Sequence, residues 1–271
     1  MKARNDRVVL ITGASSGIGK ACADHLAKGG YRVYGTSRKP PSAAPFRMLQ
    51  LDVTDDESVE GTVNELLKRE GRIDVLVNNA GIAMAGAIED TSMEEARTQL
   101  ETNFFGAFRM CRVVVPTMRA QKYGYIVTIS SIGGQIAIPF QGLYSASKFA
   151  LEGLSESLRM EVRPFGIKVI LIQPGDHRTA LTQNRQRVKG AIKDGSPYGA
   201  HVDNALARMA ADEQNGPSPE GVARLLERII NTPHPRLRYS IGPLPERLAL
   251  LLKRMAPYGV LQFGLKRYYG L

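Results

Sequence analysis

The sequence predicts an α/β fold: a doubly wound parallel sheet in a single domain, with helices on both faces. Short apolar segments rich in β-branched residues alternate with longer segments of helical periodicity, which is the pattern of a parallel sheet connected by helices. The expected strands are apolar at nearly every position, as strands covered on both faces are. A chain of 271 residues can bury a full core as one such domain.

Each expected element follows from a local pattern. The first expected strand, residues 8–12, ends at a glycine and is followed at once by a helix over 18–28. Ser218 and Pro219 form an N-terminal capping signal for a helix that ends at Ile230. The other expected strands cover residues 31–36, 46–51, 73–77, 125–130, 168–172 and 237–241. The other expected helices cover residues 58–69, 93–118 and 144–162.

Two segments stand out from this regular alternation. Residues 176–217 are polar, contain glycines and show weak periodicity. A segment that follows the carboxyl end of a strand overhangs the ligand crevice of an open α/β sheet, so we expect a mobile substrate lid here. The alternative is an ordinary surface insertion. The second segment is a basic, apolar tail over residues 242–271, and residues 1–271 as a whole are expected to form one domain.

Composition excludes several classes of protein. A hydrophobic content of 43% is typical of a globular chain and argues against disorder. Cys22 and Cys111 lie far apart and form no CxxC motif, so we expect reduced core residues in a cytosolic setting. The four histidines show no ligand spacing, and no metal site is expected. No signal peptide is visible before the first apolar run, and the expected location is cytoplasmic.

The net charge of +10 is concentrated near the C-terminus. Residues 236–271 hold seven Lys or Arg against a single acid, Glu246, while the rest of the chain is nearly balanced. We therefore expect no nucleic-acid partner. The longest apolar stretch of the tail, residues 248–252, is far too short to span a bilayer. The tail could pack on the domain as a helix, wall a pocket, mediate assembly or lie peripherally on a membrane surface.

A glycine-rich loop joins the first strand to the first helix. Its sequence is Thr12-Gly13-Ala14-Ser15-Ser16-Gly17-Ile18-Gly19. Glycines permit a tight turn and a close approach of a pyrophosphate, and the N-terminus of the following helix offers free N–H groups. The strand–loop–helix context predicts a Rossmann-type dinucleotide site. The alternative is a tight turn without a ligand.

The residues at the end of the second expected strand indicate which nicotinamide cofactor binds. An acidic residue there would accept a hydrogen bond from the ribose 2′-hydroxyl of NAD. Residues 34–39 hold no acid, whereas Arg38 can neutralise a 2′-phosphate, and Ser15 and Ser37 can donate hydrogen bonds to it. The sequence favours NADP(H) over NAD(H). The alternative is that Arg38 is a solvated surface residue.

Tyr144 and Lys148 are four residues apart on one face of the expected helix over 144–162. A free phenol has a pKa of about 10. A neighbouring ammonium and a cationic nicotinamide would stabilise the phenolate and lower that pKa. Tyr144 could then donate a proton to a developing alkoxide near neutral pH.

With these motifs the chain resembles a classical short-chain dehydrogenase/reductase. The matching stretches run in order across about 170 residues. They are the glycine-rich loop, Asp52-Val53, Asn78-Asn79-Ala80-Gly81, Asn103, Ser130-Ser131, Tyr144-Ser145-Ala146-Ser147-Lys148 and Pro174-Gly175. Any one of these motifs could arise by chance, but the ordered set is highly specific.

The resemblance implies four catalytic positions. Tyr144 is the expected general acid/base, and Ser131, thirteen residues before it, is expected to hydrogen-bond the substrate oxygen. Ser130 is the competing candidate. Lys148 is expected to hold the nicotinamide ribose and to lower the pKa of Tyr144. Asn103 is expected to fix the backbone of its helix and a water of the proton relay.

The resemblance also implies a set of cofactor-binding residues. Asp52 is expected at the adenine, and Pro174, Gly175 and Thr179 at the carboxamide. The stretch Asp176-His177-Arg178 departs from the usual family sequence. The full expected set is Gly13, Ser15, Ser16, Gly17, Ile18, Gly19, Ser37, Arg38, Asp52, Val53, Asn79, Ala80, Gly81, Tyr144, Lys148, Pro174, Gly175 and Thr179.

The expected function is NADP(H)-dependent interconversion of a ketone or aldehyde and an alcohol. Residues 232–243 resemble the estradiol 17β-dehydrogenase and retinol dehydrogenase branch of the family, which implies a lipophilic substrate such as a steroid, a retinoid or a long-chain lipid. A reductase of small ketones or sugars is the alternative. A non-catalytic nucleotide sensor is disfavoured, because all four catalytic positions are filled. The family resemblance further implies a homodimer or homotetramer.

Overall fold

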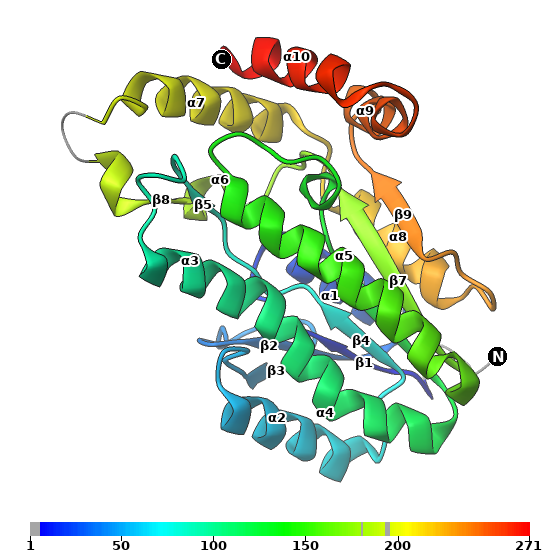
Figure 1. Cartoon of the computed structure of the whole chain (residues 1–271). Helices are drawn as coiled ribbons and strands as arrows, with labels where there is room; N and C mark the ends of the chain where they lie inside the picture. Colours follow the sequence, from blue (N-terminus) through cyan, green and yellow to red (C-terminus); the bar gives the residue numbers. More distant parts are fainter. Residues whose placement is uncertain (1–5, 180, 193–195) are drawn as a thin grey trace.

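The computed structural model describes residues 6–179, 181–192 and 196–271. Its centre is a parallel sheet with strand order β3-β2-β1-β4-β6-β7-β9 (Figure 1). The chain starts at β1, builds outward to β3, returns to β4 beside β1 and then builds outward to β9. This reversal of strand order is the doubly wound topology, so the predicted fold class is confirmed.

The described elements have the following bounds. The strands are β1 (Val8–Ile11), β2 (Arg32–Ser37), β3 (Arg47–Gln50), β4 (Val75–Asn78), β5 (Met84–Ala85), β6 (Gly124–Ile129), β7 (Ile167–Pro174), β8 (Gln186–Arg187) and β9 (Arg238–Ile241). The α-helices are α1 (Gly17–Lys28), α2 (Asp56–Glu70), α3 (Met93–Leu100), α4 (Gly106–Gln121), α5 (Gly142–Val162), α6 (Leu181–Asn184), α7 (Gly199–Asn215), α8 (Glu220–Ile230), α9 (Leu244–Met255) and α10 (Tyr258–Tyr269). Shorter helical turns are η2 (Glu101–Phe105), η3 (Ile132–Gly134), η4 (Arg163–Phe165) and η5 (Lys189–Ile192).

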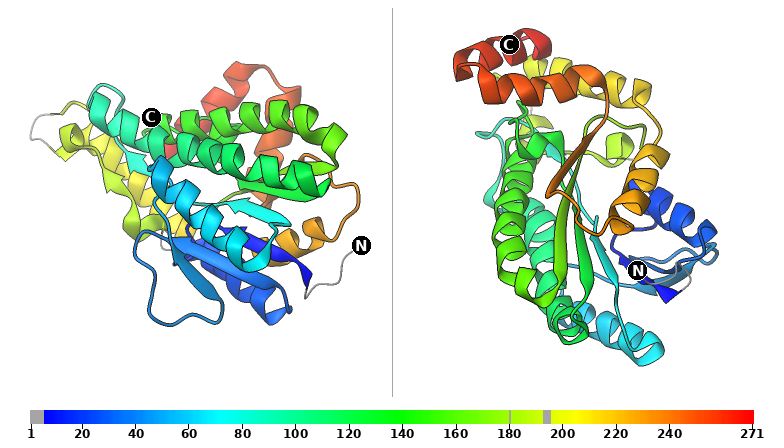
Figure 2. Two further views of the ribbon diagram at one scale, coloured as in Figure 1. Left: turned by 90° about the horizontal axis from the view of Figure 1, so that it is seen from below. Right: turned by 90° about the vertical axis from the view of Figure 1, so that its right-hand side faces the viewer.

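Side-chain alternation along the strands divides the core into two layers. In β1, Val9 and Ile11 pack on the side of α1 and α8, whereas Val8 and Leu10 pack on the side of α2 and α4. Figure 2 shows these helices on opposite faces of the sheet. The β1 residues are fully buried on both sides, which explains why the strand sequences are apolar throughout. Cys22 and Cys111 are free and buried.

The predicted helix over 93–118 is present as one helical run that comprises α3, η2 and α4 and ends at Gln121. The sequence did not predict that η2, in the middle of this run, is a π-helical turn. Such a turn inserts one residue into the hydrogen-bonding pattern and is frequent at functional sites. Apolar periodicity continues across it, so the sequence pattern gave no sign of the π-helical turn.

Residues 176–217 contain more regular structure than their weak periodicity suggested. They include α6, the 17-residue helix α7 and β8, which pairs with β5. Residues 180 and 193–195 of the predicted lid lie outside the described residues. The mobility expected of this segment stays a prediction.

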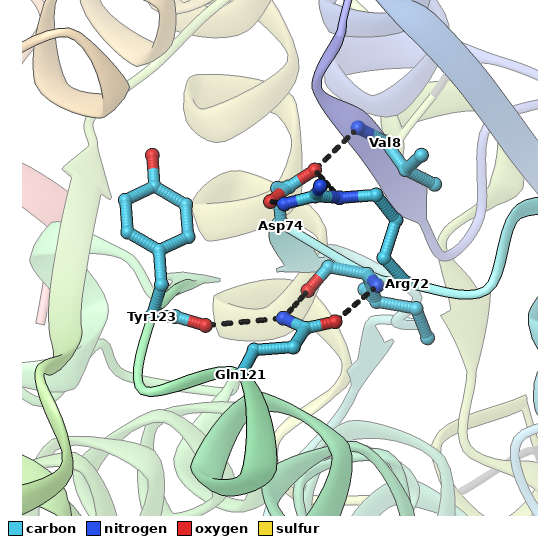
Figure 3. Close-up of polar contacts among 6 residues, drawn as sticks. Val8, Arg72, Asp74, Gln121 and Tyr123 are labelled. Carbon is cyan, nitrogen blue, oxygen red and sulfur yellow. Dashed lines mark hydrogen bonds and ion pairs between the residues drawn. The ribbon is translucent and has the colours of Figure 1, made fainter. Parts of the chain in front are cut away.

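Polar side chains tie the elements together at the amino end of the sheet. Asp74 accepts hydrogen bonds from the backbone N–H of Val8 and from the guanidinium of Arg72 (Figure 3). The Gln121 amide bonds both backbone groups of Ile73 and the carbonyl of Tyr123. These contacts fix the starts of β1, β4 and β6. They leave the carboxyl ends of the strands free to form a site.

The tail forms two helices rather than one, because Pro257 separates α9 from α10. Both lie beyond the carboxyl ends of the strands, across the outer edge of the molecule (Figures 1 and 2). Leu250 of α9 and Leu261 of α10 are buried against Ile132 and Ile136. Among the described residues, no helix is both long and apolar enough to cross a membrane.

Candidate active site

The carboxyl ends of β1, β4, β6 and β7 open into one cleft of about 1130 Å³. It runs from the glycine-rich loop after β1, past Asn79 and Ser131, to Gly175 at the end of β7. The strand order reverses between β1 and β4, and open α/β sheets bind ligands at such a switch point. The predicted catalytic and cofactor-binding residues therefore converge on the edge of the sheet where the topology places a site.

Tyr144, Lys148 and Ser131 come together in the middle of this cleft. Tyr144 and Lys148 project from α5, and the Lys148 ammonium lies 5.7 Å from the centroid of the Tyr144 ring. The ammonium also donates a 2.9 Å hydrogen bond to the carbonyl of Ile129 at the end of β6. Ser131 accepts a 3.0 Å bond from the N–H of Gly133, so its own hydroxyl proton can point to Tyr144 or a substrate oxygen.

Burial dominates the titration of both α5 residues. Burial raises the pKa of Tyr144 above its ordinary value, although a hydrogen bond with Ser131 acts in the lowering direction. Burial also lowers the pKa of Lys148 to about 8, against the opposing charge of Glu152. Burial thus acts against the lowering of the Tyr144 pKa that is expected from the Lys148 ammonium together with a cationic nicotinamide. That expectation counted cations alone and left out the desolvation of a phenol packed in the cleft.

Asn103 occupies the π-helical turn η2 and is buried. Its side-chain carbonyl accepts from the N–H of Ile82 at 2.8 Å, and its amide donates to the carbonyl of Ile82 at 3.0 Å. The amide also donates to the hydroxyl of Ser147, which lies beside Lys148 on α5. Asn103 thus joins η2, the chain after β4 and α5. It orients the helix that carries Tyr144 and Lys148.

The structure distinguishes the two serines at the end of β6. Ser130 is buried, and its hydroxyl lies against the backbone of Gly134, where an added Cβ would come within 2.7 Å. Ser131 is partly exposed in the cleft and interacts with Tyr144. This geometry supports the choice of Ser131 over Ser130 as the residue that faces the substrate.

The glycine-rich loop has the geometry of a phosphate cradle. Gly13 has a φ of +67°, and a Cβ there would come within 2.9 Å of the Ala80 backbone. The amide of Asn79 donates to the carbonyls of Thr12 and Gly13 and fixes the loop. Ser16, the N-cap of α1, makes no side-chain cap bond within the part of the chain that the structure describes. The first residues of α1, Gly17 and Ile18, line the cleft, and N–H groups without a side-chain cap at this helix start suit a pyrophosphate.

The adenosine end of the cleft is bordered by the predicted residues. Ser15, Ser37 and Arg38 line it, and Arg38 is exposed at the end of β2. Burial tends to raise the pKa of Asp52, but hydrogen bonds from Thr54 and the charge of Arg38 outweigh it and hold that pKa below its usual value. A charged Asp52 beside a charged Arg38 gives this end acceptors and donors for a nucleotide.

The remaining predicted cofactor residues also line the cleft. Thr179 lies near the glycine-rich loop, since a Cβ on Gly17 would come within 3.6 Å of its side chain. Its hydroxyl accepts from the N–H of Leu181. Gly17, Ile18, Val53, Ala80, Gly81, Pro174 and Gly175 line the same cleft. Gly19 lies within α1 and packs against Asn79 and Gly13, so it supports the loop without lining the cleft.

Sequence reasoning missed a pair of carboxyl groups in the cleft. Glu246 of α9 accepts a 3.0 Å hydrogen bond from the N–H of Asp176, and the two side chains also bond each other. Burial and the charge of Glu246 raise the pKa of Asp176 to about 8. A Cβ on Gly175 would meet the carboxyl of Glu246, so this carboxyl lies directly against the glycine. The pair fastens α9 to the end of β7.

We expect this pair to make stability fall as the pH rises. Folded Asp176 binds its proton up to a pH of about 8, whereas an unfolded Asp has a pKa of about 3.9. The folded state therefore holds an extra proton between these values, and its advantage is full at low pH and lost towards pH 8. Asp176→Asn should remove this contribution, so the Tm of the variant should decline less than that of the parent between pH 5 and 8. A difference of about 2 °C would correspond to about 1 kcal/mol in a chain of this size.

Thermal unfolding followed by circular dichroism measures this effect. Asp203→Asn is the matched control, because Asp203 is an exposed carboxylate paired with Arg187 outside the cleft. Parallel Tm profiles for the parent and Asp176→Asn would contradict the assignment.

The far wall of the cleft is apolar and is formed by the tail. Its side chains come from α9 and α10, and Ile132 and Ile136 pack against them. The tail side chains that form the wall are Ala249, Leu252, Val260, Leu261 and Leu265. Of the readings left open for the tail, the pocket wall therefore describes its inner side.

Comparisons with known proteins show the family to which this chain belongs. A family model described as short chain dehydrogenase matches residues 7–190. A 3-ketodihydrosphingosine reductase from Bacteroides thetaiotaomicron is 43% identical over 266 residues, covering 98% of each chain. Retinol dehydrogenase 8 from Bos taurus is 34% identical and covers 94% of this chain and 87% of its own length.

A solved structure shows the same similarity. A short-chain dehydrogenase from Streptomyces avermitilis superposes with a TM-score of 0.80 at 34% identity, covering 97% of this chain and 95% of the other. Its similarity extends over the tail as well as the sheet. Together, the family match and the relatives aligned along nearly the whole length show that this chain belongs to the short-chain dehydrogenase family, a family of oxidoreductases.

Proposed function

We propose that this chain is an NADP(H)-dependent reductase of a ketone carried by a long-chain lipid. The observation that carries the proposal is the composition of the cleft. Tyr144 and Ser131 line the cleft together with the apolar side chains of α9 and α10. A polar reacting centre beside an extended apolar wall suits a carbonyl on a hydrocarbon chain.

Similarity to a named relative supports a particular substrate class. The relative from Bacteroides thetaiotaomicron, 43% identical over nearly its whole length, is a 3-ketodihydrosphingosine reductase. We propose that the present chain likewise reduces a 3-keto group of a long-chain base. Retinol dehydrogenase 8, a second relative, is named for another lipophilic substrate.

The residues of the cleft can be assigned roles in this reaction. The chemistry that a nicotinamide cofactor supplies here is hydride transfer to the carbonyl carbon. Tyr144 donates the proton from its phenol oxygen to the developing alkoxide, and Ser131 donates a hydrogen bond to the same oxygen. Lys148 holds the ribose of the cofactor and supplies positive charge beside Tyr144. Asn103 positions α5 through its bonds to Ile82 and Ser147.

NADP(H) is the cofactor that the adenosine end favours. A short-chain dehydrogenase fold implies a nicotinamide cofactor, and this end offers Arg38 with Ser15 and Ser37 as donors for a 2′-phosphate. Residues 34–39 contain no acid that would repel that phosphate. A cellular NADPH supply would drive the reaction towards reduction. We further propose that the chain works in the cytoplasm as a homodimer or homotetramer.

Reduction of small ketones or sugars is the second candidate. The family includes enzymes for polar substrates, and the acidic and basic groups of the cleft, Glu213 and Arg185, could bind hydroxyl groups. The apolar wall that α9 and α10 contribute to the same cleft favours the lipid substrate.

The test is oxidation of NADPH by the purified chain in detergent micelles. 3-Ketodihydrosphingosine is the principal substrate, and retinal, a ketosteroid and a small diketone are the comparison substrates. We expect the highest kcat/KM for 3-ketodihydrosphingosine and formation of the 3-hydroxy product. A preference for the small diketone would overturn the lipid assignment, and a lack of turnover with all four would overturn the catalytic one.

A further inference from the structure

The outer side of α9 presents an apolar stripe to solvent. Leu244, Leu248, Leu251 and Met255 are 63%, 51%, 52% and 85% exposed. Their spacing of four, three and four residues places them on one face of the helix. The inner residues of α9, Leu250 among them, pack on the domain. This helix is therefore apolar on two sides, and the domain covers only one of them.

α10 extends this apolar surface. Tyr258 and Phe263 are each 69% exposed, and Leu271, which follows the helix, is 45% exposed. Both tail helices lie at the outer edge of the molecule, as the right-hand view of Figure 2 shows. Large apolar side chains that gather exposed on two neighbouring helices mark an interaction surface. We call the exposed side chains of α9, α10 and Leu271 the tail surface.

The tail surface is also positively charged. Arg247, Lys266 and Arg267 are exposed on it. Glu246, the single acid of the tail, points inward to Asp176 and does not offset them. Basic side chains beside exposed Leu, Phe and Tyr are the composition of helices that lie in a membrane interface, where each Lys or Arg is attracted to anionic lipid.

We propose that the tail surface docks on an anionic lipid bilayer. A second copy of the chain is a weaker partner, because a symmetric contact would bring Arg247, Lys266 and Arg267 of both copies together. An anionic bilayer satisfies both properties at once: the apolar stripe enters the acyl region, and the cations meet lipid phosphates.

The cleft adjoins this same surface. Leu252 and Val260 line the cleft and are 44% and 53% exposed, so its mouth lies between α9 and α10 beside the apolar stripe. Docking would place the mouth against the lipid. A lipid substrate could then pass to Tyr144 along the apolar wall without crossing water. This route rests on the proposed function, whereas the docking does not.

Vesicle co-sedimentation of the full chain tests the docking. The vesicles are phosphatidylcholine alone, or phosphatidylcholine mixed with phosphatidylglycerol. We expect binding to the anionic vesicles, and weaker binding at about 1 M salt than at about 0.01 M, because the Debye length falls from about 30 Å to about 3 Å. Absence of binding to either vesicle at low salt would overturn the proposal.

Two double variants separate the contributions. Leu248→Glu with Leu251→Glu should lower vesicle affinity at least about tenfold, since two apolar side chains no longer leave water. Lys266→Glu with Arg267→Glu should abolish the preference for anionic lipid. Met93→Glu with Met160→Glu is the matched control, because these exposed methionines lie on α3 and α5, away from the tail surface. Equal loss of binding in the control would overturn the proposal.

Additional readouts distinguish a folding defect and the rival partner. Each variant should have the same Tm as the parent chain and should reduce a water-soluble ketone at the same rate, because none of the altered residues lines the cleft. Light scattering reports the oligomeric state. If Leu248→Glu with Leu251→Glu formed a smaller oligomer than the parent but bound vesicles equally well, the surface would be assigned to a second copy of the chain. Vesicle binding without any lipid reduction would leave docking in place and overturn the proposed substrate alone.

Discussion

Tyr144→Phe should lower kcat by about 10²- to 10⁴-fold, the usual contribution of a positioned general acid. The substitution removes one oxygen and the proton that Tyr144 gives to the substrate, while the ring stays packed on α5. Lys148, which lies 5.7 Å from the ring centroid, keeps its bond to the carbonyl of Ile129. The dissociation constant for NADPH should change only a few-fold, because the phenol is not expected to hold the phosphates or the adenine.

Steady-state kinetics with the preferred ketone and fluorescence titration with NADPH measure the two effects. Tyr268→Phe is the matched control, because Tyr268 also lines the cleft but belongs to α10, where its hydroxyl bonds Asp212. The control should keep kcat within a few-fold of the parent. Near-full activity of Tyr144→Phe in a pure sample would show that another group donates the proton, and a large loss of NADPH affinity would assign Tyr144 to binding.

Local pattern in the sequence was sufficient for the sheet and for choosing residues that line one cleft. Strand alternation is a property of consecutive residues, and β1 shows it in the assignment of Val9 and Leu10 to opposite layers. The glycine-rich loop, Tyr144 and Lys148 are each defined by short spacings. The topology then brings them to one edge of the sheet, because parallel strands all end on the same side.

Contacts between segments that are far apart in the sequence could not be predicted from local spacings. Asp176 and Glu246 are 70 residues apart, and neither position suggests the other. Their pairing depends on the path of the chain through α7, α8 and β9 before α9 returns to the end of β7. The π-helical turn that holds Asn103 could not be predicted for a different reason: its apolar periodicity is continuous with that of the helices on each side.

In the tail, the repeat of leucines did not show which face of the helix would be buried. Its leucines repeat at helical spacing, which indicates an amphipathic helix without indicating which face is buried. In the structure Leu250 is buried, whereas Leu248 and Leu251 are exposed. A sequence pattern records the amount of apolar surface, and the number of partners available to cover it depends on the tertiary structure.

Arg38→Asp should reverse the preference of the enzyme between its two candidate cofactors. A hydrogen bond between a charged donor and a phosphate contributes about 1.5–3 kcal/mol, and its loss alone corresponds to roughly ten- to a hundredfold in affinity. The new carboxylate would add repulsion towards a 2′-phosphate and could accept a hydrogen bond from a 2′-hydroxyl. We expect kcat/KM for NADPH to fall about a hundredfold or more and that for NADH to rise.

Position and charge decide this result, so the controls alter them one at a time. Arg38→Ala removes the cation without adding an anion and should weaken NADPH while leaving NADH nearly unchanged. Arg112→Asp reverses a charge on α4, outside the cleft, where Arg112 lies 58% exposed near Glu60, and it should change neither cofactor. Inhibition by adenosine 2′,5′-bisphosphate provides a readout independent of turnover, and it should weaken in parallel with NADPH. An unchanged ratio of NADPH to NADH efficiency in Arg38→Asp would mean that the exposed guanidinium at the end of β2 stays in solvent, and the discrimination would then have to come from Ser15 and Ser37 alone.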